Sequence, residues 1–426
     1  MKRIIYFIAV VFLIAALTGC FSPWAAGSIS ISLGVPSNSR FFIDQEIDLP
    51  EFEHIITLRG PGGTVTKTLG KGELSAVFEV APGKWTIDVR AIGNSPSIVD
   101  DHPDLGFPKR MLRALAIEPD IEITQGVNAK VNVFMRPAVE VDNLDQLDFA
   151  LSEAEWGEIF VLKKNMDIDA KHGEIGIGYL YEAGQYFEPR SQYIIFIADT
   201  DIVIKKELNF SQNIFLIQCY STLQLGIPGM TGTITFDGNS ANLAGSTSRS
   251  PIISIDSGSL FMSDGVILTN NYADRGGAVI VGNSDNYAFF RMDGGIITGN
   301  RANSDGIVGG GVGGGVYVEN GAEFFMTGGI IRSNTATYSG GGVYVNDGIF
   351  HKESYGGIIY GQDEGINSNI LTSTQIGFGF AVCYEADFMG DTGPLAILAQ
   401  RNRTIRANDE IFTSHVLNPD HWDVIF

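Results

Sequence analysis

The sequence has few cysteines, few basic residues and no long apolar run beyond its first twenty residues. Three cysteines in 426 residues are too few for a disulfide-built scaffold. Lys and Arg number 28 against 49 Asp and Glu, which gives a formal net charge of −21. Such a surface repels phosphates, so we expect no nucleic-acid partner. No later stretch reaches the ~18–20 apolar residues that a membrane-spanning helix needs.

Glycine is abundant where charge is scarce. The chain has 52 glycines, while only 18% of its residues are charged. This composition favours a β-rich protein with many tight turns over a helical one. The length exceeds that of one ordinary core, so we expect two domains, or one domain followed by an elongated repeat array.

The N-terminus has the layout of an export signal. Lys2 and Arg3 precede an apolar run from Ile4 to Leu17, which is the length of a signal-peptide core. The run ends in "LTGC", which resembles the lipobox of bacterial lipoproteins. That resemblance implies a signal peptide at 1–19, cleavage before Cys20 and a diacylglyceryl thioether on its sulfur. The alternative is an ordinary cleaved signal followed by a chance cysteine.

The two remaining cysteines, Cys219 and Cys383, lie far apart in the sequence. One disulfide is possible in an exported protein. Two buried thiols are the interpretation that we favour, because cysteine is among the most often buried residue types.

A tether at 20–27 leads into a region of short alternating runs at 28–137. In "KWTIDVRAIG", Trp85, Ile87 and Val89 fall on one face of a strand, since side chains alternate along a strand. Several such runs between turn signals predict a β-sandwich. The pattern resembles the small Ig-like or transthyretin-like sandwiches of bacterial surface proteins. The stretch "VDDHPD" at 99–104 suggests either a metal site or, as we prefer, a plain acidic loop.

A repeated phrase dominates the region 138–426. "MSDGVILTN" begins at Met262, "MDGGIITGN" at Met292 and "MTGGIIRSN" at Met326, 30 and 34 residues apart. "GGAVIV" and two copies of "GGGVYV" alternate with these phrases, at 276–281, 313–318 and 340–345. Periods of this size indicate stacked structural units, and two phrases per period indicate several short strands in each.

Identical spacing is what stacking requires, because equivalent residues of successive coils then lie about 4.8 Å apart. We therefore predict an internal ladder of the three methionines. Gly265, Gly295 and Gly329 would supply bends. Further ladders are expected of Ile267, Ile297 and Ile331 inside, and of Asn270, Asn300 and Asn334 at a corner.

An amphipathic segment precedes the repeats, with Leu144, Leu147, Leu151 and Ala154 on one helical face. It resembles the entry of right-handed parallel β-helix proteins, in which a helix caps the first coil. The repeats resemble those of chlamydial polymorphic outer membrane proteins, whose motifs are GGA[ILV] and FxxN. "GGAV" at 276–279 matches the first motif, whereas "ILTN", "ITGN" and "IRSN" only echo the second.

No arrangement of residues in the repeat region predicts a known catalytic, cofactor or metal site. Asp199 and Asp201 alternate on one strand face, and Lys205 and Lys206 follow, which is as typical of a solvated edge as of a site. Polysaccharide hydrolysis would need paired carboxylates across a sugar. The histidines are scattered, at His172, His351, His415 and His421. The aromatic residues Tyr317, Tyr338, Tyr344 and Tyr355 form either a binding strip or ordinary packing.

From the sequence we therefore expect an all-β protein, with a sandwich and then a right-handed parallel β-helix with a short capping helix. The expected function is that of a lipid-anchored lipoprotein of the cell envelope, at the outer membrane or cell surface. It would present a non-catalytic binding or adhesion surface to an extracellular protein or glycan. The alternatives are a polysaccharide lyase or hydrolase with an unrecognised site, and a purely structural surface-layer component. The oligomeric state stays open.

Replacing Cys20 with Ser should abolish incorporation of labelled palmitate and release the chain from membranes, because the thioether cannot form. Labelling of intact cells followed by membrane fractionation tests this prediction. Equal labelling of the wild type and the variant would contradict it.

Overall fold

The computed structural model describes residues 26–35, 48–154, 156–182, 185–208, 210–240, 249–282, 287–303, 310–353, 356–362, 364–372, 379, 381–390, 393–401, 405, 411–412 and 424–425. The predicted signal peptide and Cys20 lie outside these ranges. The chain divides into two compact units. Of the described residues, unit 1 comprises those at 26–35, 48–93 and 112–136, and unit 2 comprises those at 94–111 and from 137 onward.

Unit 1 contains two sheets. The first has the order β4–β1–β7, from strands β1 (Gly27–Gly34), β4 (Ser75–Val80) and β7 (Asn128–Phe134). The second has the order β3–β2–β5–β6, from strands β2 (Glu53–Gly60), β3 (Gly63–Leu69), β5 (Gly83–Asn94) and β6 (Arg110–Ile123), and the 3-10 turn η1 (Leu49–Glu51) precedes it. The sandwich at 28–137 stays a prediction.

The alternation in β5 decides which of its residues are buried. Trp85, Ile87 and Val89 are each at most 1% exposed, as a period of two requires. Asp88 points to the other face and is also buried, because Arg59 binds its Oδ2 at 2.7 Å and Arg90 binds its Oδ1 at 3.1 Å. A buried carboxylate needs such pairing.

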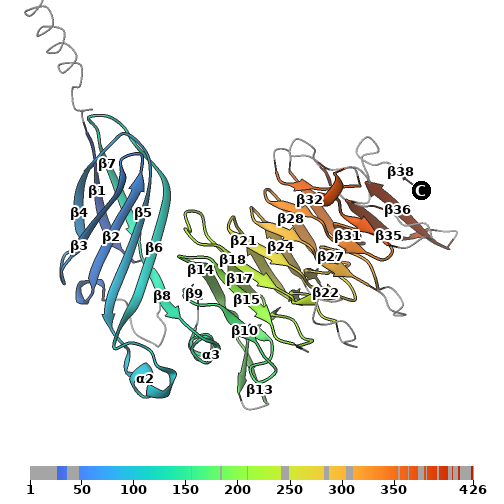
Figure 1. Cartoon of the computed structure of the whole chain (residues 1–426), viewed down its shortest axis with the longest axis horizontal. Coiled ribbons are helices and arrows are strands. Elements are labelled where there is room, and N and C mark those ends of the chain that lie inside the picture. The colour runs from blue at the N-terminus through green and yellow to red at the C-terminus, as the bar shows by residue number, and fades with distance from the viewer. Residues whose placement is uncertain are drawn as a thin grey trace, which may run out of the picture. The chain divides into compact units, whose positions relative to one another are not determined.

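Unit 2 is a parallel β-helix: the chain visits sheet 1, sheet 2 and sheet 3 in turn and repeats this circuit (Figure 1). Sheet 1 contains β8 (Arg136–Val141), β9 (Trp156–Leu162), β14 (Tyr193–Ala198), β17 (Ser221–Leu225), β20 (Gly258–Met262), β24 (Ala288–Met292), β28 (Glu323–Met326), β32 (Ile349–Lys352) and β37 (Ile411–Phe412). Sheet 2 contains β10 (Met166–Ile168), β15 (Ile202–Lys206), β18 (Ile234–Asp237), β21 (Val266–Thr269), β25 (Ile296–Thr298), β29 (Ile330–Arg332) and β33 (Ile358–Ile359).

Sheet 3 contains β11 (Ile175–Ile177), β16 (Phe215–Ile217), β19 (Ile253–Ile255), β23 (Val279–Val281), β27 (Val316–Val318), β31 (Val343–Asn346), β35 (Val382–Gly390), β36 (Gly393–Arg401) and β38 (Val424–Ile425). A short corner sheet contains β22 (Tyr272–Ala273), β26 (Arg301–Ala302), β30 (Thr335–Ala336) and β34 (Ile370–Leu371), and a hairpin of β12 (Tyr179–Glu182) and β13 (Gln185–Pro189) projects from an early coil. Neighbouring strands pair in parallel from β9 to β32 in sheet 1 and throughout sheet 2.

A short helix covers the first coil. Helix α3 (Leu144–Glu153) begins at Asn143, whose side chain accepts a hydrogen bond from the backbone N–H of Gln146. Its Leu147 and Leu151 join the same buried cluster as Phe160 and Ile168 of the first coil. The short helix α2 (Ser97–Asp100) and the 3-10 turn η2 (Pro103–Leu105) lie beside it, and Gln146 donates to the carbonyl of Leu105 at 2.9 Å.

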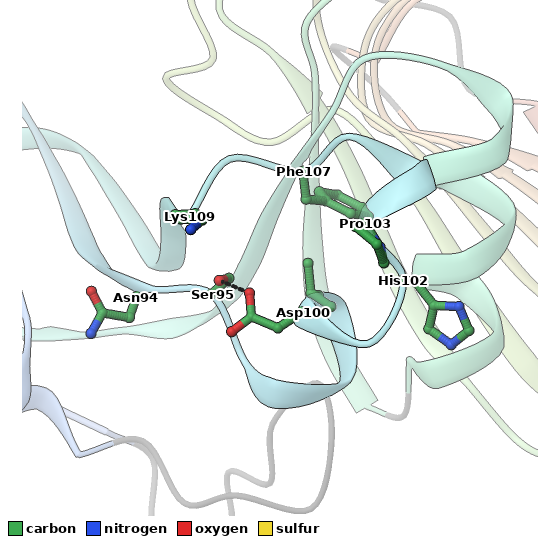
Figure 2. Close-up of a pocket in the computed structure, with 8 residues that line it drawn as sticks. Asn94, Ser95, Asp100, His102, Pro103, Phe107 and Lys109 are labelled. Atoms are coloured by element: carbon green, nitrogen blue, oxygen red, sulfur yellow. Dashed lines mark hydrogen bonds between the residues drawn. The ribbon is translucent and has the colours of Figure 1, made fainter.

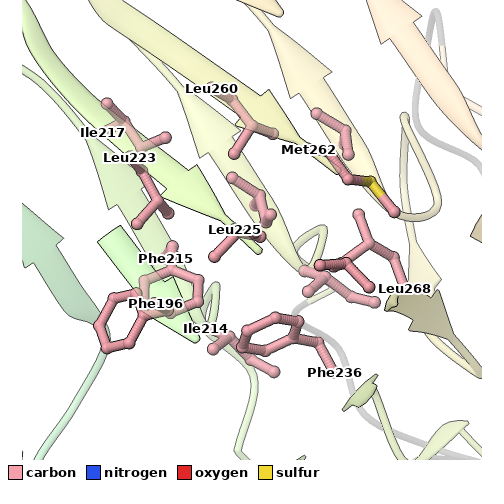
Figure 3. Packing of buried hydrophobic residues seen from close by; sticks show 14 of the residues in the cluster. Phe196, Ile214, Phe215, Ile217, Leu223, Leu225, Phe236, Leu260, Met262 and Leu268 are labelled. Atoms are coloured by element: carbon pink, nitrogen blue, oxygen red, sulfur yellow. The ribbon is translucent and has the colours of Figure 1, made fainter. Parts of the chain in front are cut away.

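The interior of the β-helix is built of stacked, fully buried side chains from all three sheets (Figure 3). Met262 pairs with Met292, and Met292 with Met326, in sheet 1. Beside them Phe290 and Phe324 stack with ring centroids 4.6 Å apart and an angle of 6° between planes.

The glycines of the repeated phrase are explained by these methionines. Gly295 has φ +81°, and a Cβ there would lie 2.6 Å from Met262 Cε of the coil before. Gly329 has the same φ and stands in the same relation to Met292. The methionine of one coil thus requires the glycine of the next, both for conformation and for space.

The asparagine ladder differs from the sequence prediction at its first member. The first copy carries one extra residue, since Met262 pairs with Met292 but Ile267 pairs with Ile296. Asn271 therefore takes the place that was expected of Asn270, and Leu268 takes the interior place that was expected of Ile267. Asn270 instead has φ +55° and donates to Asp237 Oδ1.

The ladder itself runs through Asn271, Asn300, Asn334 and Asn369. Each backbone N–H donates to the amide oxygen of the next member, at 3.1, 3.0 and 2.9 Å. The Asn300 amide N–H groups donate to the carbonyls of Leu268 and Thr298. The buried polar atoms of the corner are thereby satisfied between coils.

A buried lysine terminates this ladder. Lys206 Nζ donates to Asn271 Oδ1 at 3.1 Å and to the carbonyls of Ser250 and Pro251 at 3.1 and 3.0 Å. Burial lowers the pKa of Lys206 to about 7, and the carboxylate of Glu174 opposes this effect. Three acceptors match the three donors of an ammonium group, so the hydrogen-bond geometry at the end of the ladder fits the protonated form of Lys206.

Replacing Asn300 with Leu should destabilise the chain by roughly 2–5 kcal/mol, because it leaves the Asn271 N–H and the Leu268 carbonyl buried without a partner. Chemical denaturation of the full chain measures the effect. Thr298→Ala, on the outward face of β25 just before Asn300, is the matched control and should change the free energy of unfolding by less than about 1 kcal/mol. Equal effects of the two variants would contradict the role of the ladder.

Candidate functional site

The outward face of sheet 1 carries two rows of side chains. Because side chains alternate along a strand, every second residue of β17, β20, β24, β28 and β32 points away from the core. Row 1 contains Thr222, Ser259, Phe289, Glu323 and Ile349, and row 2 contains Gln224, Phe261, Arg291, Phe325 and His351.

Aromatic rings form a continuous file across these two rows. The centroid distances are 5.9 Å from Phe261 to Phe289, 5.7 Å from Phe289 to Phe325 and 5.2 Å from Phe325 to His351. Tyr287, just before β24, lies parallel to Phe289 at 6.4 Å. We call these five residues the aromatic strip.

The aromatic strip is accessible to solvent. Tyr287 is 50% exposed, and Phe261, Phe289, Phe325 and His351 are half-buried. Contiguous exposed apolar surface of this kind marks interaction sites on proteins. Aromatic residues are also enriched at the centres of protein interfaces.

Polar side chains lie among the rings. Gln224 and Ser259 occupy the rows beside Phe261, and Arg291 and Glu323 stand beside Phe325 and Phe289. Arg291 Nε binds Asp293 Oδ1 at 2.7 Å. Burial raises the pKa of the Tyr287 hydroxyl, and the carboxylate of Glu323 raises it further.

The tyrosines that the sequence suggested for a strip lie elsewhere. Tyr317 and Tyr344 stack at 5.7 Å on sheet 3, but they are only 3% and 7% exposed and pack with Val312 and Cys383. Tyr338 is 45% exposed, and Tyr355 lies outside the described residues. The Tyr317–Tyr344 pair is therefore packing.

The carboxylates considered for catalysis have structural partners. Asp199 Oδ2 lies 3.3 Å from Lys163 Nζ, which also binds Glu140. Asp201 accepts hydrogen bonds from the backbone N–H and the hydroxyl of Thr233. Lys205 is half-buried on the outside of β15, opposite in direction to the buried Lys206.

Titratable groups elsewhere do not converge on a metal position. Within the described part of the chain, no group of three or more His, Cys, Asp or Glu side chains could hold a metal ion. His54 is fully buried in unit 1 without a hydrogen bond to any described group, and burial lowers its pKa. His415 and His421 lie outside the described residues.

Cys219 is half-buried and Cys383 buried, and no disulfide joins these two described residues.

The loop containing "VDDHPD" borders a cavity of about 640 Å³ (Figure 2). Val99, Pro103 and Phe107 line it together with polar groups. Ser95 Oγ donates to Asp100 Oδ1 at 2.6 Å, so the Ser95 hydroxyl and the Asp100 carboxylate are partners of each other. The His102 ring lies 5.1 Å from that of Phe149 on α3, which gives this histidine a packing role.

A second histidine connects the capping helix to the first coil. His172 Nδ1 lies 2.7 Å from Asp169 Oδ1, and its Nε2 lies 3.1 Å from Asp145 Oδ1 on α3. Burial lowers the pKa of His172, but hydrogen bonds with Asp145 and Asp169 and the nearby charge of Asp148 outweigh burial and raise it above 6.5.

Because the folded chain holds the His172 proton to a higher pH than the unfolded chain, this contribution to stability is present below the ordinary pKa. It is lost as the pH rises through the raised value. His172→Gln should therefore lower the unfolding temperature more at about pH 5.5 than at about pH 8. His102→Gln is the control without an ion pair among the described carboxylates, and an equal pH dependence in both variants would contradict the prediction.

None of the helices within the described ranges has the length and apolar character that spanning a membrane requires. Comparison of the chain with protein-family models, curated proteins and solved structures finds no match. The aromatic strip is thus the candidate site on geometric grounds alone.

Proposed function

We propose that this chain is a lipid-anchored lipoprotein of the bacterial cell envelope that presents its β-helix as a binding or adhesion surface. The aromatic strip carries the proposal, because it is a partly exposed apolar surface on a rigid sheet. Such a surface costs solvation free energy in a monomer, and covering it with a partner recovers that free energy. The partner would be an extracellular protein or glycan.

The anchor rests on the sequence "LTGC" at 17–20 and the apolar run before it. A lipid on Cys20 would place the strip at the outer membrane or cell surface, where an extracellular partner is accessible. The likeness of the repeats to those of polymorphic outer membrane proteins supports the same location. The rigid stack suits binding rather than a closing active site, since the rings are fixed by neighbouring coils.

A non-catalytic role is the form of the proposal that the charged residues support. Asp199 is engaged by Lys163 and Asp201 by Thr233, so these carboxylates have assigned structural roles. Loss of glycan turnover on mutating either residue would favour the alternative, a polysaccharide lyase or hydrolase.

Removing two rings of the strip should strongly weaken binding. The double variant Phe289→Ala, Phe325→Ala should weaken adhesion of the full chain to its target by roughly a thousandfold, since buried aromatic anchors contribute about 2 kcal/mol each. The measurement is adhesion to extracellular-matrix proteins, to partner cells and to a glycan array. Tyr338→Ala, an exposed tyrosine outside the strip, is the matched control and should bind as the wild type does.

Folding of each variant is checked by its unfolding temperature, which separates lost binding from lost structure. Equal adhesion by the double variant and the Tyr338→Ala control would contradict the proposal. Absence of binding by the wild-type chain to every target would also contradict it.

A further inference from the structure

The aromatic strip is a line and not a round patch. Phe261, Phe289, Phe325 and His351 come from four successive coils, and Tyr287 adds a second ring beside Phe289. Coils are about 4.8 Å apart, so three steps extend the file over about 14 Å along the stacking direction. A partner that fills this surface must itself be extended and must present an apolar face at each step.

A compact protein partner fits this shape poorly. Energetically important residues of protein interfaces cluster near the centre of the patch, where surrounding contacts exclude water from them. Here, polar side chains flank the rings from Gln224 and Ser259 at one end to Arg291 and Glu323 further along, and Ile349 is the row 1 neighbour at the last coil. No ring of the file is therefore shielded on all sides by apolar neighbours in its two rows.

A sugar chain complements this arrangement of aromatic rings and polar side chains. Each pyranose ring has a flat face of C–H groups, which packs on an aromatic ring, and an edge of hydroxyl groups. The hydroxyl of Ser259 and the carboxylate of Glu323 offer donors and acceptors to those hydroxyls, whereas the Gln224 amide is already bound by the Tyr193 hydroxyl and the Gly226 carbonyl. Apolar platforms combined with a few polar groups are typical of small-molecule and sugar recognition.

The charges around the aromatic strip favour a neutral saccharide over an acidic one. Apart from His351, Arg291 is the basic residue within the two rows, and Asp293 binds it at 2.7 Å. Glu323 adds negative charge to row 1, and the whole chain has a formal net charge of −21. A polyanionic saccharide would be repelled by this surface.

From the file of rings and its polar borders we infer that the aromatic strip binds a linear neutral polysaccharide lying along the stacking direction of the coils. This inference rests on the proposed function and specifies its partner. Neighbouring rings would contact successive sugars, so affinity would depend on chain length. The contact would depend on aromatic faces, so an aliphatic side chain of similar volume would not replace a ring.

The test measures binding of neutral linear oligosaccharides, from disaccharide to hexasaccharide, to the full chain by titration calorimetry. Cellulose-, mannan- and chitin-derived series are the probes, and polygalacturonate is the acidic comparison. We expect at least one neutral series to bind about tenfold or more tightly as the hexasaccharide than as the disaccharide, and polygalacturonate to bind more weakly.

Variants separate ring stacking from general apolar contact. Phe289→Leu and Phe325→Leu should each weaken hexasaccharide binding by about tenfold. Val77→Leu, at an exposed position in unit 1, should leave it unchanged. Leucine variants that bind the hexasaccharide as the wild type does would overturn the inference.

The outcomes also distinguish the two levels of the proposal. Strip-dependent adhesion to a protein target without binding of any oligosaccharide would overturn the polysaccharide inference and leave the proposed function standing. Preferential binding of polygalacturonate would overturn the neutral-chain inference. Absence of binding to proteins, cells and saccharides alike would contradict both.

Discussion

In-register pairing of parallel strands across successive coils is the constraint on which unit 2 depends. Each residue must lie over its equivalent one strand spacing away, so each position needs a side chain that packs against a copy of itself or a close relative. Met262, Met292 and Met326 satisfy this requirement in one row, and Phe290, Phe324 and Phe350 satisfy it in the next. Burial of such rows drives the stack to form, at about 25 cal/mol per Å² of apolar surface.

In-register stacking also restricts which polar side chains can be buried in the interior. A buried amide in a stack must satisfy donors and acceptors toward the coils on both sides, and asparagine can do so because it carries both. A ladder of this kind needs an end, and Lys206 provides one with three donors directed at Asn271, Ser250 and Pro251. The stack itself also needs an end, which α3 provides at the first coil with Leu147 and Leu151.

The repeat spacing predicts the all-β class and the parallel stacking, because stacking leaves a periodic trace in the sequence. The capping helix is predicted separately, from Leu144, Leu147, Leu151 and Ala154 on one helical face. Spacing alone did not give the register. One extra residue in the first copy moves the ladder from Asn270 to Asn271, and this shift is visible only once strands pair as Ile267 with Ile296. A side-chain period of two turns a shift of one residue into a change of face. The same sensitivity explains why Ile267 points outward and Leu268 inward.

The aromatic strip escaped prediction because it does not follow the repeat. Phe261 and Phe325 lie in row 2 and Phe289 in row 1, so the three do not share one position of the repeated phrase. A trace exists all the same: Phe289–Phe290 and Phe324–Phe325 are adjacent pairs, and alternation directs one ring of each pair inward and the other outward. The inner ring recurs because the core requires it. Stacking does not require the outer ring, and its cost in exposed apolar surface is what singles it out as a site for contact with another molecule.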